Sequence, residues 1–149
     1  MRKKTGKDFV ITMKINSSDF YQGGLSVQDF VQTCRLMSSA GIDAIEVSGN
    51  GTSRSGIKPG QNEAYFFNAA MTLAALVKTP VILVGGLRSV EKINTILDTT
   101  KIEYVSLSRP LVREPDLVNR WRNGDLTPSK CVSCNGCYHS DGHKCVFNK

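Results

Sequence analysis

The sequence predicts an α/β fold in which four parallel strands, each followed by a helix, pack as in a (β/α)8 TIM barrel. Three observations support this prediction. Short β-rich runs alternate four times with segments of helical apolar spacing. In three of the predicted strands one face is apolar and the other partly polar, whereas a sheet covered by helices on both faces needs two apolar faces. The 149 residues are also enough to bury a core without disulfide bonds.

The first βα unit is predicted to contain a strand over residues 9–15 and a helix that begins at Ser26. Apolar residues of this helix recur three or four positions apart, and Ser26 and Asp29 have the spacing of a capping box. Gly41 ends the helix. The second unit has a strand over 44–48, a Gly/Ser-rich loop and a helix over 65–77.

The third predicted strand, residues 80–84, is a continuous apolar run typical of buried parallel strands, and its helix starts near Ser89. The fourth strand covers 103–107. A short helix then opens near Pro115, is expected to bury Leu117, Val118 and Trp121, and stops at Gly124. The rest of the chain is irregular. We therefore divide the sequence into a βα region, residues 1–124, and a Cys-rich tail, residues 125–149.

Net charge and hydropathy exclude several classes of partner. Lys and Arg exceed Asp and Glu by 19 to 13, a formal charge of +6, which is compatible with an anionic ligand or surface. The only cluster of basic residues lies at the N-terminus, without the interleaved aromatic residues of a nucleic-acid surface (Arg2, Lys3, Lys4 and Lys7). The sequence has neither a run of eighteen apolar residues nor a signal peptide. We expect no nucleic acid, no membrane and a cytoplasmic location.

Two loops after consecutive strands suggest a phosphate site. Gly85 and Gly86 follow the third strand and lead into a helix, and Ser108 and Arg109 follow the fourth. Glycines let backbone N–H groups approach an anion, and the loops after the last two strands of a (β/α)8 barrel often bind phosphate. The alternative is that the glycines only make a tight turn and Arg109 forms a surface ion pair. The presence of two such loops after consecutive strands favours a phosphate site over this alternative.

Lys14 is a second candidate binding residue. It lies near the C-terminal end of the first strand, on the face opposite Ile11, Met13 and Ile15, so it should point into the mouth of the barrel. An inward lysine must be paired or serve a ligand, since an unpaired buried ammonium group is costly. Glu46 on the next strand is the expected partner. The sequence leaves both interpretations of Lys14 open.

The five cysteines fall into two groups. Cys34 lies within an apolar helical pattern and is expected to be a buried structural thiol. The other four lie within the last nineteen residues, at positions Cys131, Cys134, Cys137 and Cys145. Without a signal peptide, this cluster favours metal binding in a reducing compartment over disulfides. Four thiolates suit a [4Fe–4S] cluster, zinc suits four thiolates or three with His139 or His143, and free cysteines are the third alternative.

Five segments, in this order, resemble the old yellow enzyme family of NADH:flavin oxidoreductases, which bind FMN on a (β/α)8 barrel: residues 10–16, 23–25, 40–48, 80–86 and 106–117. The resemblance covers nearly the whole chain but corresponds only to the C-terminal half of the family barrel. The family's substrate-binding His/Asn or His/His pair, its catalytic tyrosine and its first flavin contacts belong to the other half. The resemblance therefore implies a half-barrel that is a fragment or one part of a split enzyme and is inactive alone.

The resemblance also assigns roles by position. Lys14 takes the place of the family's basic residue beside the flavin N1–C2 carbonyl edge, and Gly85 and Gly86 match the glycine turn at the FMN phosphate. Ser108 and Arg109 match a pair usually written Gly-Arg, so the serine is a departure. A flavin–iron-sulfur branch of the family carries a cysteine run just after the barrel, with a last spacing longer than the seven residues between Cys137 and Cys145.

Together these features predict part of an FMN-dependent NAD(P)H:flavin oxidoreductase of the ene-reductase type, which passes hydride to a small electrophilic substrate once a complementary half completes it. The alternative is a non-catalytic half-barrel that binds phosphate or serves in assembly, as a homo-oligomer or with a partner half-barrel. The length fits a half-barrel, since four units at roughly 31 residues each need about 125 residues and leave a remainder close to the length of the tail.

Overall fold

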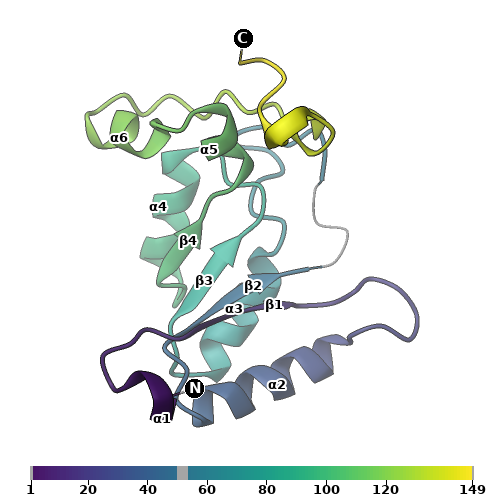
Figure 1. Cartoon of the computed structure of the whole chain (residues 1–149), viewed down its shortest axis with the longest axis vertical. Helices are drawn as coiled ribbons and strands as arrows, with labels where there is room; N and C mark the ends of the chain where they lie inside the picture. Colours follow the sequence, from purple (N-terminus) through teal and green to yellow (C-terminus); the bar gives the residue numbers. More distant parts are fainter. Residues whose placement is uncertain (1, 50–53, 149) are drawn as a thin grey trace.

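The computed structural model describes residues 2–49 and 54–148, in which four parallel strands form one sheet in the order β1-β2-β3-β4 (Figure 1). The strands are β1 (Thr12–Asn16), β2 (Ala44–Ser48), β3 (Val81–Val84) and β4 (Tyr104–Ser106). Each strand pairs with the next one along the chain, which is the strand order of a (β/α)8 barrel. The predicted α/β fold with four parallel strands is confirmed.

Three helices connect the strands: α2 (Val27–Ser39), α3 (Phe67–Leu76) and α4 (Val90–Thr99). After β4 come α5 (Arg109–Arg113) and α6 (Leu117–Arg122), and the tail contains two 3-10 turns, Gly136–Tyr138 and Asp141–His143. A short N-terminal helix, α1 (Arg2–Thr5), precedes β1. Neither α1 nor α5 was predicted, because segments of four or five residues show no apolar period in a sequence. The tail lies beside α5, at the end of the sheet toward which β3 points (Figure 1).

The predicted capping box fixes the start of α2. The Ser26 hydroxyl accepts a hydrogen bond from the Asp29 backbone N–H at 3.1 Å, and the Asp29 carboxylate accepts one from the Ser26 N–H at 3.3 Å. Two N–H groups that the helix itself leaves without partners are thereby satisfied. Gly41, at φ 83°, lies just beyond the C-cap residue of this helix.

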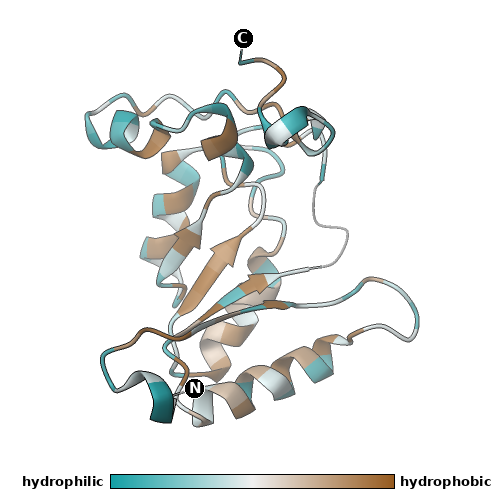
Figure 2. Ribbon diagram, in the orientation of Figure 1, coloured by the Kyte–Doolittle hydropathy of each residue, from teal (hydrophilic) through white to brown (hydrophobic). Residues whose placement is uncertain are grey.

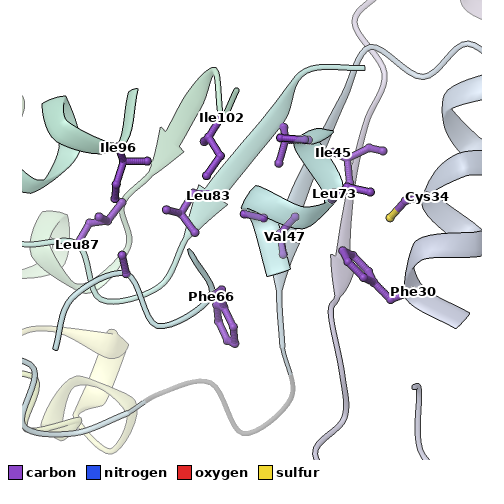
Figure 3. Close-up of a cluster of buried hydrophobic side chains, with 14 of the residues drawn as sticks. Phe30, Cys34, Ile45, Val47, Phe66, Leu73, Leu83, Leu87, Ile96 and Ile102 are labelled. Atoms are coloured by element: carbon purple, nitrogen blue, oxygen red, sulfur yellow. The ribbon is translucent and has the colours of Figure 1, made fainter. Parts of the chain in front are cut away.

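The core lies between the helices and one face of the sheet (Figure 3). Ile45, Val47 and Leu83 are completely buried there, and Figure 2 shows β3 as hydrophobic along its whole length. The helices contribute Phe30 and Cys34 from α2 and Leu73 from α3, among others. Burial raises the pKa of the Cys34 thiol to about 11, so this cysteine is the buried structural thiol that the sequence predicts.

Among the helices of residues 2–49 and 54–148, none covers the opposite face of the sheet. One row of paired residues crosses this inner face from strand to strand: Lys14, Glu46, Ile82 and Tyr104. The Lys14 side chain is 58% exposed and Tyr104 is 54% exposed. A doubly wound fold would bury such a row under helices, so the one-sided packing confirms the architecture of part of a barrel.

Some details differ from the sequence-based expectation. β1 begins at Thr12 and not at Phe9, because the pairing with β2 starts at Thr12, and both Phe9 and Val10 are exposed. Leu117 is buried as predicted, but Val118 is 53% exposed and Trp121 only half-buried. Adjacent residues of a helix point about 100° apart, so when Leu117 of α6 faces the core, Val118 is directed toward solvent.

The loop predicted after β2 falls partly on residues 50–53, which lie outside the described residues. Over the described ranges, the helices are all too short or too polar to cross a lipid bilayer.

We predict that Leu73→Ala destabilises the fold by about 2–5 kcal/mol, because Leu73 is fully buried and its truncation leaves a cavity. Leu76→Ala is the matched control, since Leu76 lies on the same helix but is 42% exposed and should cost less than about 1 kcal/mol. Chemical denaturation of both variants measures the difference. Equal losses would contradict the one-sided core.

Candidate cofactor site

All five residues predicted to bind a cofactor line one pocket at the C-terminal ends of the strands: Lys14, Gly85, Gly86, Ser108 and Arg109. They come from β1 and from the loops after β3 and β4, segments that are far apart in the sequence. The pocket has a volume of about 250 Å³. Typical ligand pockets occupy roughly 300–1,000 Å³, so the described residues enclose only part of a nucleotide-sized ligand.

The glycine turn after β3 has a backbone that only glycine adopts without strain. Gly85 and Gly86 have φ angles of 114° and 78°. A Cβ atom on Gly85 would lie 2.7 Å from the Phe66 ring, and one on Gly86 would lie 2.7 Å from the Tyr65 ring. The two aromatic rings stand edge to face with centroids 4.7 Å apart, and both line the pocket. Glycine at these positions therefore lets the aromatic wall and the turn approach each other closely.

Lys14 forms an ion pair with Glu46 across the first two strands, so the partner expected from the sequence is confirmed. The pairing does not remove Lys14 from the pocket, because its side chain still lines the wall. Glu46 is the less exposed partner, with 20% of its side chain accessible against 58% for Lys14. The carboxylate thus holds the ammonium group at the mouth of the half-barrel, where a ligand can also reach it.

Arg109 is buried rather than displayed as a surface ion pair, with 7% of its area exposed. Its Nη1 donates to the backbone carbonyl of Arg54 at 2.9 Å and to the side-chain oxygen of Asn135. It is the first residue of α5 and lines both the cofactor pocket and the apolar pocket of the cysteine tail. Ser108, just before it, is exposed at the pocket rim.

Arg88 is the site residue that the sequence argument missed. It follows the glycine turn, lines the same pocket and is 1% exposed. Burial lowers the pKa of Arg88, the thiol of Cys131 opposes this effect, and the nearby charge of Arg109 adds to it. Its place directly after Gly85, Gly86 and Leu87 was the available signal, but an arginine ahead of a helix is usually exposed.

The four tail cysteines line one small apolar pocket, together with residues of α5. Cys134 accepts a hydrogen bond from the Gly136 N–H, with 3.4 Å between N and Sγ, and the guanidinium of Arg113 lies 4.0 Å from the Cys145 sulfur. All five cysteines of the chain are free thiols. Neither His139 nor His143 lines this pocket, and the His143 ring instead lies 3.3 Å from the backbone oxygen of Cys137.

The thiols share a pocket without converging on one point. Across residues 2–49 and 54–148, no three Cys, His, Asp or Glu side chains are arranged to hold a single metal ion. A zinc site brings its sulfurs to roughly 2.3 Å from one ion, whereas in an iron-sulfur cluster the thiolates bind different irons and stand further apart. Four thiols around one apolar pocket are therefore compatible with a cluster.

Glu114 attaches the beginning of the tail to the βα region. Its carboxylate accepts hydrogen bonds from the Lys130 N–H at 2.6 Å and the Ser129 hydroxyl at 3.0 Å, and it forms an ion pair with Arg120 at 3.0 Å. Burial alone would raise the pKa of Glu114, but these hydrogen bonds and the charge of Arg120 outweigh it and hold the pKa below its usual value. The carboxylate is therefore ionised at neutral pH, as this anchor requires.

Comparison with known proteins identifies relatives of the chain. NADH oxidase of Thermoanaerobacter brockii is 25% identical over 92% of the chain and 22% of its own length. NADH-dependent flavin oxidoreductase iliE of Neonectria sp. (strain DH2) is 32% identical over 72% of the chain and 16% of its own length. The chain thus spans about a fifth of these relatives or less. No family model matches the sequence.

Among solved structures, 2-naphthoyl-CoA reductase has the same fold over 90% of the chain, with a TM-score of 0.72 and 20% sequence identity. The match covers 21% of that protein. The likeness confirms the fold of the chain as part of a larger architecture.

We predict that Gly86→Ala destabilises the chain by at least about 1 kcal/mol more than Gly23→Ala, since overpacking a filled site costs about 1–3 kcal/mol. Both glycines have a φ angle near 80°, 78° for Gly86 and 81° for Gly23, but only a Cβ on Gly86 would meet the Tyr65 ring. The pair therefore separates backbone strain from steric overlap. Urea denaturation measures it, and similar losses for both variants would show that the Tyr65 ring does not pack on the turn.

Proposed function

Because the chain resembles the old yellow enzyme family in sequence and its fold is that of part of a (β/α)8 barrel, we propose that it binds FMN as the flavin- and phosphate-binding half of an NAD(P)H:flavin oxidoreductase. One observation supports this most directly. The five positions to which the resemblance assigns flavin contacts all line a single pocket, although they come from three separate segments.

The phosphate end of the ligand is proposed to lie at the glycine turn. Backbone amides in a turn of two positive-φ glycines can approach phosphate oxygens without obstruction from a Cβ. Among the described residues Arg109 donates to two groups, both through Nη1, so we propose that Nε and Nη2 contact the phosphate. Ser108 offers a hydroxyl at the pocket rim where the family has glycine.

The ring end is proposed to lie near Lys14. When bound, the flavin supplies the redox chemistry, in which hydride is accepted from NAD(P)H and passed to a small electrophilic substrate. Lys14 supplies a positive charge where negative charge grows on the ring, and fixed charges of this kind stabilise such states. Glu46 restrains the long lysine side chain, so less conformational entropy is lost when the ligand binds.

We propose that the tail binds a [4Fe–4S] cluster through Cys131, Cys134, Cys137 and Cys145. The common apolar pocket of the four thiols and the arginines beside it suit an anionic cluster, whereas the absence of a three-ligand group in the described part of the chain disfavours zinc at one point. Free cysteines are typical of a reducing compartment, which supports the proposal of a cytoplasmic location.

The half-barrel is proposed to be inactive alone. In the inner row, Lys14 and Tyr104 are exposed and Glu46 and Ile82 are half-buried, whereas a reacting flavin needs water excluded from its site. A complementary half-barrel would cover this face and supply the groups that act on the substrate.

FMN titration tests the flavin proposal. We expect the purified chain to bind FMN and quench its fluorescence, and Arg109→Met to weaken binding by about 10- to 100-fold, since a charge-assisted hydrogen bond contributes about 1.5–3 kcal/mol. Lys14→Met should lower the reduction potential of the bound flavin, because it removes a charge that favours the anionic reduced form.

Arg35→Met and Lys101→Met are the controls, since both replace exposed basic residues outside the pocket. A folded chain that does not bind FMN at micromolar concentrations, even with an N-terminal half-barrel of a relative added, would contradict the proposal.

A second candidate function is assembly through the uncovered face, and it is favoured by β1 and β4, which are the two edge strands of the sheet in the described part of the chain. Both edge strands run parallel to their neighbours, so β4 of one copy can pair with β1 of another, and two such junctions close eight strands around a twofold axis. Val10 is 68% exposed at one edge and Tyr104 54% exposed on the strand at the other.

We predict a dimer in light-scattering measurements if assembly is the function. Tyr104→Asp should convert it to a monomer, because the charge would face the interior of the closed barrel. Val118→Asp is the control, since Val118 is equally exposed, at 53%, but lies on α6 away from the sheet. A stable wild-type monomer would exclude this function.

A further inference from the structure

Arg88 is a fully buried cation that forms no ion pair with a carboxylate in the described part of the chain. It is 1% exposed and is the largest of the completely buried side chains. The ion pairs found among the described residues join Lys14 to Glu46 and Arg120 to Glu114 and Asp125, and none involves Arg88. A buried charge is costly unless an opposite charge and hydrogen bonds compensate it. The counter-charge of Arg88 must therefore come from another group.

Neutral acceptors satisfy most of its hydrogen-bonding capacity. Nη1 donates to the backbone carbonyl of Leu87 at 2.7 Å, Nε to the carbonyl of Cys131 at 3.2 Å, and Nη2 to the Ser133 hydroxyl at 2.7 Å. The backbone carbonyl of Arg88 in turn accepts a hydrogen bond from the Ser129 N–H at 2.8 Å. Arg88 thus contacts three residues of the tail: Ser129, Cys131 and Ser133. Cys131 is the first cysteine of the tail, and Ser133 directly precedes the second.

Glu63 is a buried carboxylate that forms no ion pair with Arg88 among the described residues. Its Oε2 accepts a hydrogen bond from the Ser89 hydroxyl at 2.8 Å, and its Oε1 has no hydrogen-bond partner among the described residues. The guanidinium group donates instead to the Cys131 carbonyl and the Ser133 hydroxyl, so it is directed toward the first cysteine segment.

We propose that Arg88 is the counter-charge of the cysteine site and a positioning residue for the thiolates of Cys131 and Cys134. This inference rests on the proposed cluster. Ionised thiolates bound to iron carry a net negative charge, which compensates the buried guanidinium, while the bonds to Cys131 and Ser133 fix the segment that bears these ligands. Arg113 beside Cys145 has a comparable place at the other end of the cysteine run.

The location of Arg88 gives this role a second consequence. Leu87 and Arg88 follow the glycine turn directly and line the cofactor pocket, so one residue contacts both proposed sites. A positive charge near a cluster stabilises its reduced, more negative state and raises its reduction potential. Removing the charge should lower the potential as well as loosen the ligands.

The experiment compares the full-length wild-type chain with Arg88→Met, Arg88→Lys and the surface control Arg122→Met. Each is incubated anaerobically with ferrous iron, sulfide and dithiothreitol, and iron and sulfide per chain, visible absorption and midpoint potential are then measured. We expect Arg88→Met to lose iron to a chelator at least tenfold faster than wild type and to have a lower potential. Arg88→Lys should restore the potential in large part but not the retention of iron, since it keeps the charge but loses the planar donors.

Two results would overturn the inference in distinguishable ways. If the wild-type chain binds FMN but assembles no iron-sulfur cluster, the proposed cluster and the role of Arg88 both fail. If Arg88→Met assembles a cluster with the retention and potential of wild type, only the role of Arg88 fails.

Glu63→Gln keeps the test decisive if Arg88→Met does not fold. With the cluster as counter-charge, Glu63→Gln should retain iron and keep the potential of wild type. If Glu63 is instead the true partner of Arg88, Glu63→Gln will lower the midpoint of thermal unfolding by the same amount with and without iron, and the inference is then wrong.

Discussion

The helices cover one face of the sheet only, and the rest of the structure follows from this constraint. The core-facing side chains of β2 and β3 include Ile45, Val47 and Leu83. Because side chains alternate along a strand, the residues between them must point to the uncovered side of the sheet. Lys14 and Glu46 lie there as an ion pair that stays partly solvated. A partly polar inner face of this kind is unstable under a second layer of helices but suitable for a ligand.

The parallel direction of the strands then determines where the ligand site forms. All four strands end on the same side, so the loops after β3 and β4 meet beside the end of β1. The short helix α5 begins there, and Arg109 at its start reaches Asn135 of the tail. Because Glu114 at the end of the same helix binds Ser129 and Lys130, α5 holds the beginning of the cysteine tail, and the tail contributes Tyr138 to the pocket.

Local patterns in the sequence were sufficient for the strands, for the capping box of α2 and for the five pocket positions, because each depends on spacing or on the order of elements. Arg88 was missed because its acceptors, Cys131 and Ser133, lie more than forty residues away. The exposure of Val118 was missed for a related reason, since a six-residue helix is too short for periodicity to define its buried face. Contacts between segments that are distant in the sequence could not be predicted from residue spacing.

The same long-range contacts link the stability of the tail to that of the glycine turn. If the tail detaches, Arg88 loses the Cys131 carbonyl and the Ser133 hydroxyl, and its buried guanidinium must become solvated or remain without acceptors. Solvating it requires movement of the segment that begins with Gly85 and Gly86, against which Tyr65 and Phe66 are packed. A group that orders the tail therefore also makes the glycine turn more rigid, and a ligand bound at the turn would stabilise the tail by the same coupling free energy.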